Sequence, residues 1–238
     1  MEQEISRYSY IMVIALIISS IFNYFYQVVM GILLPKHEFG VAHSRYFIAS
    51  VLTQNTFSWS RTRRIASSLQ IEEVSKVFRT TTAGNFVLAI IASVLILYCS
   101  HKSETYFVLN AFIVIALILS AFTNSYNSLF RAMKKFSQIA TANVMSAFLK
   151  LFSAVILVML GTGAVGGVAG LLISIAAVLA YLAYHASKIE LPSSKGFVKD
   201  MIPETFYVSI IFLGITFIIN SSIIFMRWFS GSDVLAGD

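Results

Sequence analysis

The chain alternates long apolar runs with short polar segments, and this alternation predicts its fold. Each run is long enough, at roughly 1.5 Å per helical residue, to cross about 30 Å of hydrocarbon as a helix. The runs lie at about 8–34, 41–60, 83–98 with flanks, 106–127, 139–160, 165–184 and 204–225. The pattern therefore predicts an all-α protein, a polytopic transmembrane helix bundle of about seven spans.

Two segments after the first run are more polar than the rest. The second run, 41–60, contains His43, Arg45, Gln54 and Asn55, so that taken alone it resembles an interfacial helix. However, the residues that follow Arg45 at steps of three or four share one mostly polar helical face. We therefore interpret this run as a second span that lines a polar interior. Residues 65–80 are interpreted either as an amphipathic surface helix or as a solvated connector.

The order of the runs predicts the domain organisation. We expect an N-terminal six-helix transmembrane bundle at 1–187, a cytoplasmic linker at 188–203, and the first helix and turn of a second, missing bundle at 204–238. An apolar helix end, a polar turn and a glycine occur at 30–40 and recur at 226–237, about 197 residues later. Internal duplication of helix bundles is common in transporters. The sequence thus predicts one six-helix lobe plus the first helix of a second lobe.

Composition and charge place the protein in a membrane. Hydrophobic residues make up 58% of the chain and charged residues only 12%, whereas soluble domains carry about a quarter charged residues. Twelve of the 17 lysines and arginines fall on one side of the predicted topology, which predicts a multi-pass protein of the cytoplasmic membrane with a cytoplasmic N-terminus. These twelve are Arg7, Arg61, Arg63, Arg64, Lys76, Arg79, Arg131, Lys134, Lys135, Lys188, Lys195 and Lys199.

The most informative residue is Lys150, which stands in the middle of the run at 139–160. Each end of this helix is about 15 Å away, which is too far for a lysine side chain to return its charge to a headgroup layer. Asn143, Ser146, Lys150 and Ser153 follow one another by three or four and therefore share one face. We interpret this face as the wall of a water-filled cavity; the alternative is that Lys150 is a structural ion-pair or carbonyl partner inside the bundle.

Other spans carry polar stripes of the same kind. Ser20, Asn23, Gln27 and Gly31 recur by three or four in the first run, and a similar stripe precedes Arg131 in the fourth. Polar stripes in lipid must turn toward protein or water. We therefore expect one polar cavity that opens between this bundle and a second one, and its candidate substrate-binding residues are Lys150, Arg45, Asn23, Gln27, Asn124, Asn127 and Asn143.

Five glycines lie between Gly161 and Gly170, at the turn between the fifth and sixth runs. Gly163 with Gly167 and Gly166 with Gly170 have the spacing that permits close approach of membrane helices. We interpret these glycines mainly as packing residues rather than hinges. In particular, Gly167 is expected to hold the fifth and sixth spans together.

Enzyme chemistry finds little support in the sequence. It contains no HExxH motif, no phosphate-binding glycine loop and no nucleophile elbow, and its single cysteine cannot form an intrachain disulfide. The four histidines, His37, His43, His101 and His185, are scattered through turns and span ends. We therefore expect no catalytic residue, no cofactor and no metal site. A nucleic-acid partner is not implied either, because the cations lie in short loops between spans.

The chain resembles the N-terminal half of a Wzx-type polysaccharide flippase of the multidrug/oligosaccharidyl-lipid/polysaccharide exporter superfamily. The resemblance rests on LLPKHEFG after the first span, on NSLFRAMKKFSQIATANVMSAFLKL across the fourth and fifth, and on LGTGAVGGVAG before the sixth. It implies two six-helix bundles around a central cavity, and export of lipid-linked oligosaccharides by alternating access. It also implies that Lys150 and Arg45 would face a lipid pyrophosphate headgroup.

Two functions remain open at this point. The first is a flippase-type transporter whose partners are membrane lipids, a lipid-linked glycan substrate and a second bundle or partner chain. The second is a membrane-embedded structural or interaction half-bundle that does not transport. The aligned polar stripes favour the first, because a purely structural bundle has little need of a wet interior. Family members have twelve to fourteen spans, and the smaller number here favours the second.

Overall fold

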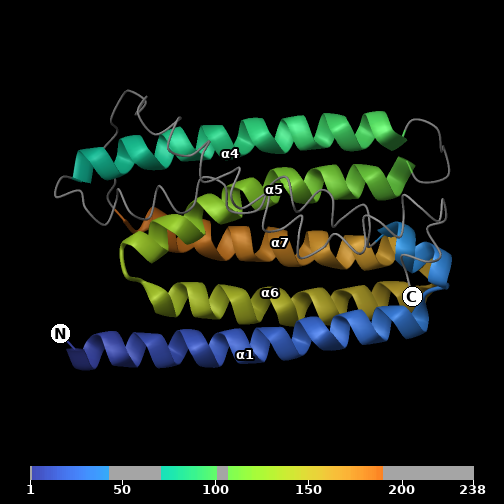
Figure 1. The fold of residues 1–238 in the computed structure, drawn as a ribbon, viewed down its shortest axis with the longest axis horizontal. Helices are drawn as coiled ribbons and strands as arrows, with labels where there is room; N and C mark the ends of the chain where they lie inside the picture. Colours follow the sequence, from blue (N-terminus) through green and yellow to red (C-terminus); the bar gives the residue numbers. More distant parts are fainter. Residues whose placement is uncertain (1, 43–70, 101–106, 190–238) are drawn as a thin grey trace, which may run out of the picture.

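The computed structural model describes residues 2–42, 71–100 and 107–189, and these residues form a bundle of long helices (Figure 1). Its elements are α1 (Glu2–Leu33), α4 (Ile71–Ser100), α5 (Phe107–Ala132), α6 (Phe136–Leu157), the short π-helical segment η2 (Val158–Thr162) and α7 (Gly163–Ser187). Residues 36–42 are also helical. No strand occurs in the described part of the chain. The predicted all-α fold class is therefore confirmed.

Four apolar stretches of the described residues are long enough to cross a membrane: Tyr10–Leu33, Val74–Tyr98, Phe107–Arg131 and Phe136–Ser187. The last contains both α6 and α7, which turn back on each other at η2 (Figure 1). These stretches coincide with the predicted first, third, fourth, fifth and sixth spans. The seventh predicted span, and all but the first two residues of the second, lie outside the described residues. The total of seven spans therefore stays a prediction, as does the domain division at 188–203.

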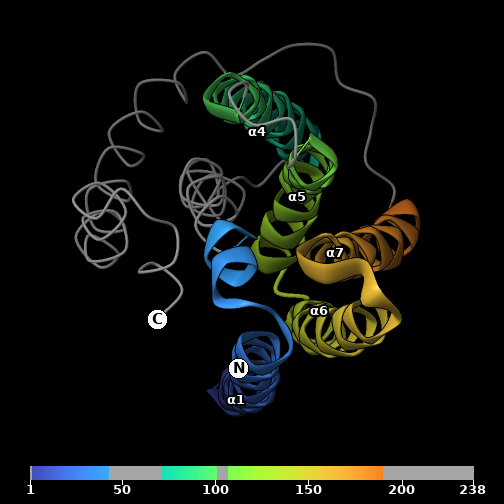
Figure 2. The ribbon, with the colours of Figure 1, turned by 90° about the vertical axis from the view of Figure 1, so that its right-hand side faces the viewer.

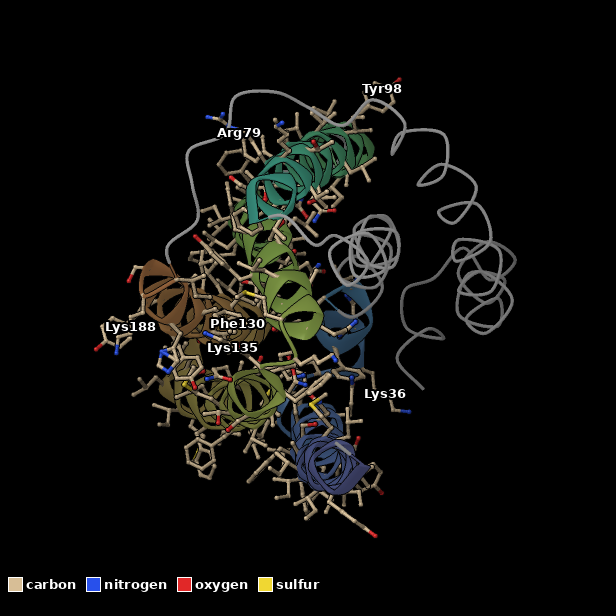
Figure 3. All side chains as sticks on the ribbon, turned by 90° about the vertical axis from the view of Figure 1, so that its left-hand side faces the viewer. Lys36, Arg79, Tyr98, Phe130, Lys135 and Lys188 are labelled. Carbon is tan, nitrogen blue, oxygen red and sulfur yellow. The ribbon has the colours of Figure 1, made fainter. Side chains whose placement is uncertain are left out.

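The helices form a curved row in the order α4, α5, α7, α6, α1 when the bundle is viewed along its length (Figure 2). The N-termini of α1 and α4, the turn between α5 and α6, and the C-terminus of α7 lie at the same end (Figure 1). We call this the basic end, and Figure 3 views the bundle from it. Its cations include Lys76, Arg79, Arg131, Lys134, Lys135 and Lys188. All six belong to the set that the sequence places in the cytoplasm.

Two apolar clusters hold α5 and α7 together at different heights. Away from the basic end, α5 and α7 pack with α4 and with the helical segment 36–42 through Val41, Ala92, Ile96, Leu109, Ile113, Leu117, Ala164 and Val168. Near the basic end they pack with α6 through Phe130, Ile139, Ala142, Val178 and Leu182. The polar residues of α5 lie between these clusters along the chain. The two clusters thus frame the middle of the bundle, where the polar stripes meet.

Helix α4 is longer than the sequence pattern predicts. Residues 65–80 were expected to form a separate surface helix or a connector, but α4 runs without interruption from Ile71 into the span. Three consecutive threonines lie at this junction, and their hydroxyls bond back to carbonyls within the same helix. For example, Thr81 Oγ1 donates to Val77 O at 2.7 Å, and Thr82 Oγ1 donates to Phe78 O at 2.7 Å. The three hydroxyls therefore have hydrogen-bond partners within α4 itself.

The turn between α6 and α7 depends on glycine conformation. Gly161 has φ of 84° and Gly163 has φ of 56°, which residues with a Cβ rarely adopt. The N–H of Ala164, in the first turn of α7, donates to Glu38 Oε2 at 2.9 Å. A carboxylate at a helix N-terminus satisfies a free N–H and complements the helix dipole. Two of the five glycines are therefore turn residues, and the segment after α1 caps the helix that they start.

Close approach of α6 and α7 occurs at Gly170 rather than at Gly167. A Cβ at Gly170 would lie 2.4 Å from the backbone N of Ala154 and 2.5 Å from its Cα. A Cβ at Gly167 would lie at ordinary contact distance, 3.7 Å from Met30 Sδ on α1. The expectation that Gly167 holds the fifth and sixth spans together is therefore wrong. The spacing predicts that small residues allow contact, but it does not say which partner each of them faces.

Candidate functional site

Lys150 is the cation in the interior of the bundle, and it projects from α6 toward α1. Its Nζ donates a hydrogen bond to Asn23 Oδ1 and lies 4.6 Å from the centroid of the Tyr26 ring. Both partners are on α1, one helical turn apart. A cation over an aromatic face gains from the ring quadrupole, and it gains more where water is scarce. The described residues thus compensate the charge with an amide oxygen and a ring, and no acidic side chain pairs with it.

A polar cavity of about 250 Å³ lies beside Lys150, between α5, α6 and α7. Its polar lining residues are Ser120, Thr123, Asn124, Asn127, Asn143, Ser146 and Lys150, and its apolar ones are Ala116, Leu117, Ala142, Leu171, Ile175 and Val178. Leu117 belongs to the cluster above the cavity, and Ala142 and Val178 belong to the cluster below it. The cavity therefore occupies the gap between the two apolar clusters. It has room for about eight waters at roughly 30 Å³ each.

The cavity offers hydrogen-bonding groups and one positive charge. None of its described lining residues is acidic. Two of its hydroxyls already donate to carbonyls of their own helix, Ser120 to Leu117 O at 2.8 Å and Thr123 to Leu119 O at 3.0 Å. By contrast, Asn127 Oδ1 is buried and has no partner among the described residues. A buried hydrogen-bond acceptor without a donor costs free energy. We therefore expect water, or a hydroxyl or amide group of a ligand, to donate to this atom.

Four of the seven predicted site residues line this cavity together: Asn124, Asn127, Asn143 and Lys150. Asn23 is not a lining residue but holds Lys150 from α1. Gln27 is exposed on α1 and is not among the lining residues. The reason is its register, because α1 packs through Phe22, Tyr26 and Met30, and Gln27 lies about 100° past Tyr26 around the helix. Arg45 lies outside the described residues.

Sequence reasoning missed part of the lining. Thr123 precedes Asn127 by four residues, so the spacing that selected Asn127 could also have found it. The apolar wall from α7, formed by Leu171, Ile175 and Val178, gives no signal in the sequence because it looks like any lipid-facing stretch. Ser153 continues the predicted stripe but does not line the cavity, since its hydroxyl lies between two acceptors, Leu149 O at 2.5 Å and Gly170 O at 3.1 Å. A position on the polar stripe of a helix therefore does not by itself tell whether a residue lines the cavity or packs against a neighbouring helix.

Both interpretations of Lys150 find support in the geometry. As the structural interpretation expects, Lys150 bonds a carbonyl oxygen, that of Asn23, and so joins α6 to α1. As the cavity interpretation expects, the same side chain lines a polar space. The ion pair that the structural interpretation also allowed is not found among the described residues. Within those residues there is also no group of three His, Cys, Asp or Glu side chains that could hold a metal ion.

No protein-family model matches this chain, and no curated protein sequence matches it either. A solved structure does match: a MOP superfamily transporter from Pyrococcus furiosus Vc1 (DSM3638), described as having a binding pocket of reverse polarity that suggests a different function. The superposition has a TM-score of 0.67 at 15% sequence identity and covers 93% of this chain. It covers 54% of the other chain, so this protein spans about half the length of that transporter. At this identity, the likeness establishes a shared fold.

Proposed function

We propose that this chain is a lobe of a transporter that exports lipid-linked oligosaccharides across the cytoplasmic membrane by alternating access, with its N-terminus in the cytoplasm. The observation that carries the proposal is the cavity between α5, α6 and α7, with Lys150 at its wall. Polar groups at mid-depth in a membrane bundle are expensive, and they commonly mark a substrate pathway. The likeness in fold to a MOP superfamily transporter supports the same class of activity.

The chemistry of the cavity suits a glycan attached to phosphate. Asparagine amides and hydroxyls both donate and accept hydrogen bonds, as sugar hydroxyls and acetamido groups do. The ammonium of Lys150 is a point charge that complements a phosphate or pyrophosphate oxygen. The absence of acidic groups from the described lining disfavours cationic substrates. A carboxylate-free pocket with one cation therefore selects for neutral or anionic polyhydroxylated substrates.

The volume of the cavity limits how much of a substrate this lobe can bind by itself. A volume of about 250 Å³ falls below the range of roughly 300–1,000 Å³ typical of ligand pockets, so it takes one sugar or one phosphate group rather than an oligosaccharide. A second bundle or a partner chain would complete the binding site. The exposed polar side of α1, which carries Ser20 and Gln27, is the surface that we expect to face it.

The alternative function is a half-bundle that is structural and does not transport. It is favoured by the bond between Lys150 and Asn23, which would tie α1 to α6 in any role. The two functions differ in what the cation is for. If Lys150 only joins the helices, then loss of either partner should have the same effect. If its charge meets the substrate, then loss of Lys150 should be far more harmful than loss of Asn23.

The experiment compares Lys150→Ala, Lys150→Arg and Asn23→Ala for export of lipid-linked glycan in cells that depend on this protein. We expect Lys150→Ala to lower export at least tenfold, Lys150→Arg to lower it less because the charge is kept, and Asn23→Ala to lower it only a few-fold. The amount of each variant in the membrane is measured in parallel. Equal losses for Lys150→Ala and Asn23→Ala would support the structural alternative, and normal export by Lys150→Ala would refute the proposal.

A further inference from the structure

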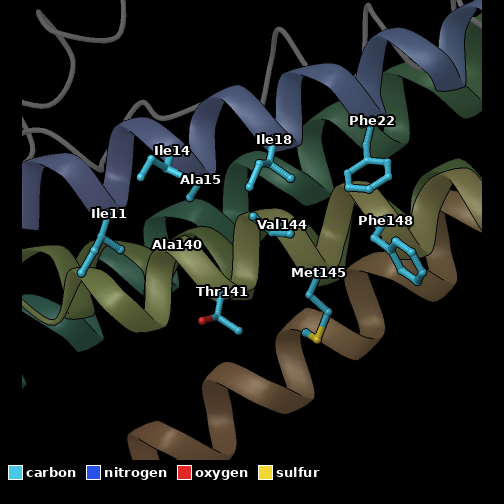
Figure 4. Close-up of a pocket in the computed structure, with 10 residues that line it drawn as sticks. All are labelled: Ile11, Ile14, Ala15, Ile18, Phe22, Ala140, Thr141, Val144, Met145 and Phe148. Carbon is cyan, nitrogen blue, oxygen red and sulfur yellow. The ribbon is translucent and has the colours of Figure 1, made fainter.

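A second hollow lies on the opposite side of the α1–α6 pair, and it is apolar. It is a groove of about 700 Å³ between the two helices (Figure 4). Its walls are Ile11, Ile14, Ala15, Ile18 and Phe22 of α1 with Ala140, Thr141, Val144, Met145 and Phe148 of α6. Thr141 is the single polar residue in that set. Because it is open to the surroundings of a membrane bundle, the groove faces hydrocarbon rather than water.

The groove has the length of one bilayer leaflet. From Ile11 to Phe22 the helical rise amounts to about 16 Å, which is close to half of the roughly 30 Å hydrocarbon thickness. It opens toward the basic end, where α1 and α6 both begin. At mid-depth it is closed by the edge-to-face contact of Phe22 with Phe148, whose ring centroids are 5.6 Å apart. An acyl chain entering from the basic end would therefore lie along the groove and stop at these rings.

The turn that precedes α6, at the same end of the bundle, carries an unusual lysine. Helix α5 ends in a turn in which Lys135 N–H donates to Phe130 O at 2.8 Å and Lys134 has φ of 56°. A glycine adopts this conformation without steric cost and is the common residue at this position of a helix end. Here the position holds an exposed lysine, directly followed by Lys135 and then by α6. This turn therefore places two consecutive lysines, one of them in a conformation that favours glycine, immediately before the helix that forms one wall of the groove.

We propose that the α1–α6 groove is a binding site for one anionic phospholipid of the leaflet at the basic end. One acyl chain lies along the groove up to Phe22 and Phe148, and the phosphate meets Lys134 and Lys135. The apolar walls match the chain, and the two lysines complement the negative headgroup. Tyr10, which is 68% exposed just before the groove begins, marks the same depth as the membrane interface, where aromatic residues gather. The site is independent of the cavity and of the proposed transport.

The first test maps where a lipid chain lies. The full chain is reconstituted with phosphatidylglycerol that carries a photoreactive group near the end of an acyl chain, and the crosslinked peptides are identified. We expect crosslinks concentrated in 11–22 and 140–148. Thr141→Trp, which fills the groove from an exposed position, should lower them at least fivefold, whereas Ile156→Trp, on an exposed site of α6 beyond the groove, should not. Crosslinks spread evenly over the exposed residues of α1 and α6 would overturn the proposal.

The second test concerns the headgroup. The crosslinking yield of phosphatidylglycerol is divided by that of phosphatidylcholine with the same chains. We expect Lys134→Gly, which relieves the strained turn and so should fold at least as well, to lower this ratio about fivefold, the usual contribution of one lysine near an anionic surface. Lys188→Ala removes a charge from the same end at the C-terminus of α7 and should leave the ratio unchanged. An equal effect of both variants, or no effect of either, would show that the lysines do not select the headgroup.

Discussion

Helix α6 packs against α7 on one face and against α1 on another, and the two interfaces differ in character. Toward α7 the contact residues are small, with Gly170 directly over Ala154 and the Ser153 hydroxyl bonded to the Gly170 carbonyl. Toward α1 the contacts are made by large side chains such as Tyr26 and Met30. The apolar groove of about 700 Å³ opens along that second interface.

The comparison shows what sets the distance between two packed membrane helices. Lipid tails are as apolar as leucine side chains, so burial of apolar surface does not favour contact of α6 with α7 over contact with α1. The α6–α7 hairpin is close because its contact residues are small and because the Ser153 hydroxyl reaches the Gly170 carbonyl across the interface. The α1–α6 pair stays farther apart along the groove, and its polar contact is the one between Lys150 and Asn23. We therefore expect the hairpin to be the rigid part of the bundle and α1 to be the adaptable part.

The largest effect on stability is expected at Gly170. Gly170→Ala places a methyl group 2.4 Å from the Ala154 backbone, so the hairpin must separate, and we expect a loss of about 2–3 kcal/mol in unfolding free energy. Gly167→Ala is the matched control, because its methyl group meets Met30 at ordinary distance, and its effect should stay within about 1 kcal/mol. Thermal unfolding in detergent measures both. Equal effects would mean that the close approach of Gly170 to Ala154 does not set the stability of the α6–α7 contact.

A smaller effect is expected at Glu38, which connects the α1 side of the bundle to the start of α7. Glu38→Ala removes the acceptor from Ala164 N–H and should cost about 1 kcal/mol, as loss of a helix cap does. Glu38→Gln keeps an acceptor and should cost less. Hydrogen exchange at 163–166 reports the cap directly, and it should become faster in Glu38→Ala. Unchanged exchange in that variant would show that the carboxylate does not hold the helix end.

The positions of the described helices could be predicted from the sequence, because a long apolar run in a membrane satisfies its backbone hydrogen bonds as a helix. The start of α4 could not, because Glu72, Glu73, Lys76 and Arg79 give its first turns the pattern of a surface helix. In the structure these turns continue directly into the span, and the hydroxyls of Thr81 and its neighbours bond to carbonyls of the same helix. Local composition therefore predicts where the described spans lie, but it does not predict where helix α4 begins.

The candidate site was predicted in part for a related reason. Spacing within one helix placed Asn124 with Asn127, and Asn143 with Lys150, on common faces. Which faces meet is set by packing between helices, and a single sequence does not reveal it. For this reason the exposed position of Gln27, the apolar wall from α7 and the partner of Gly170 all became visible only in the structure.

The central claim is that the space beside Lys150 is a water-filled part of a transport route, and one labelling experiment tests it directly. The single native cysteine, Cys99, is replaced by serine, and Ser146→Cys or Ile156→Cys is added. Ser146 lines the cavity, whereas Ile156 is 58% exposed on α6 outside the cavity, where we expect lipid to cover it. We predict that a charged, membrane-impermeant thiol reagent modifies Ser146→Cys and spares Ile156→Cys, because thiolates form only where water reaches. Protection of both positions would contradict the account.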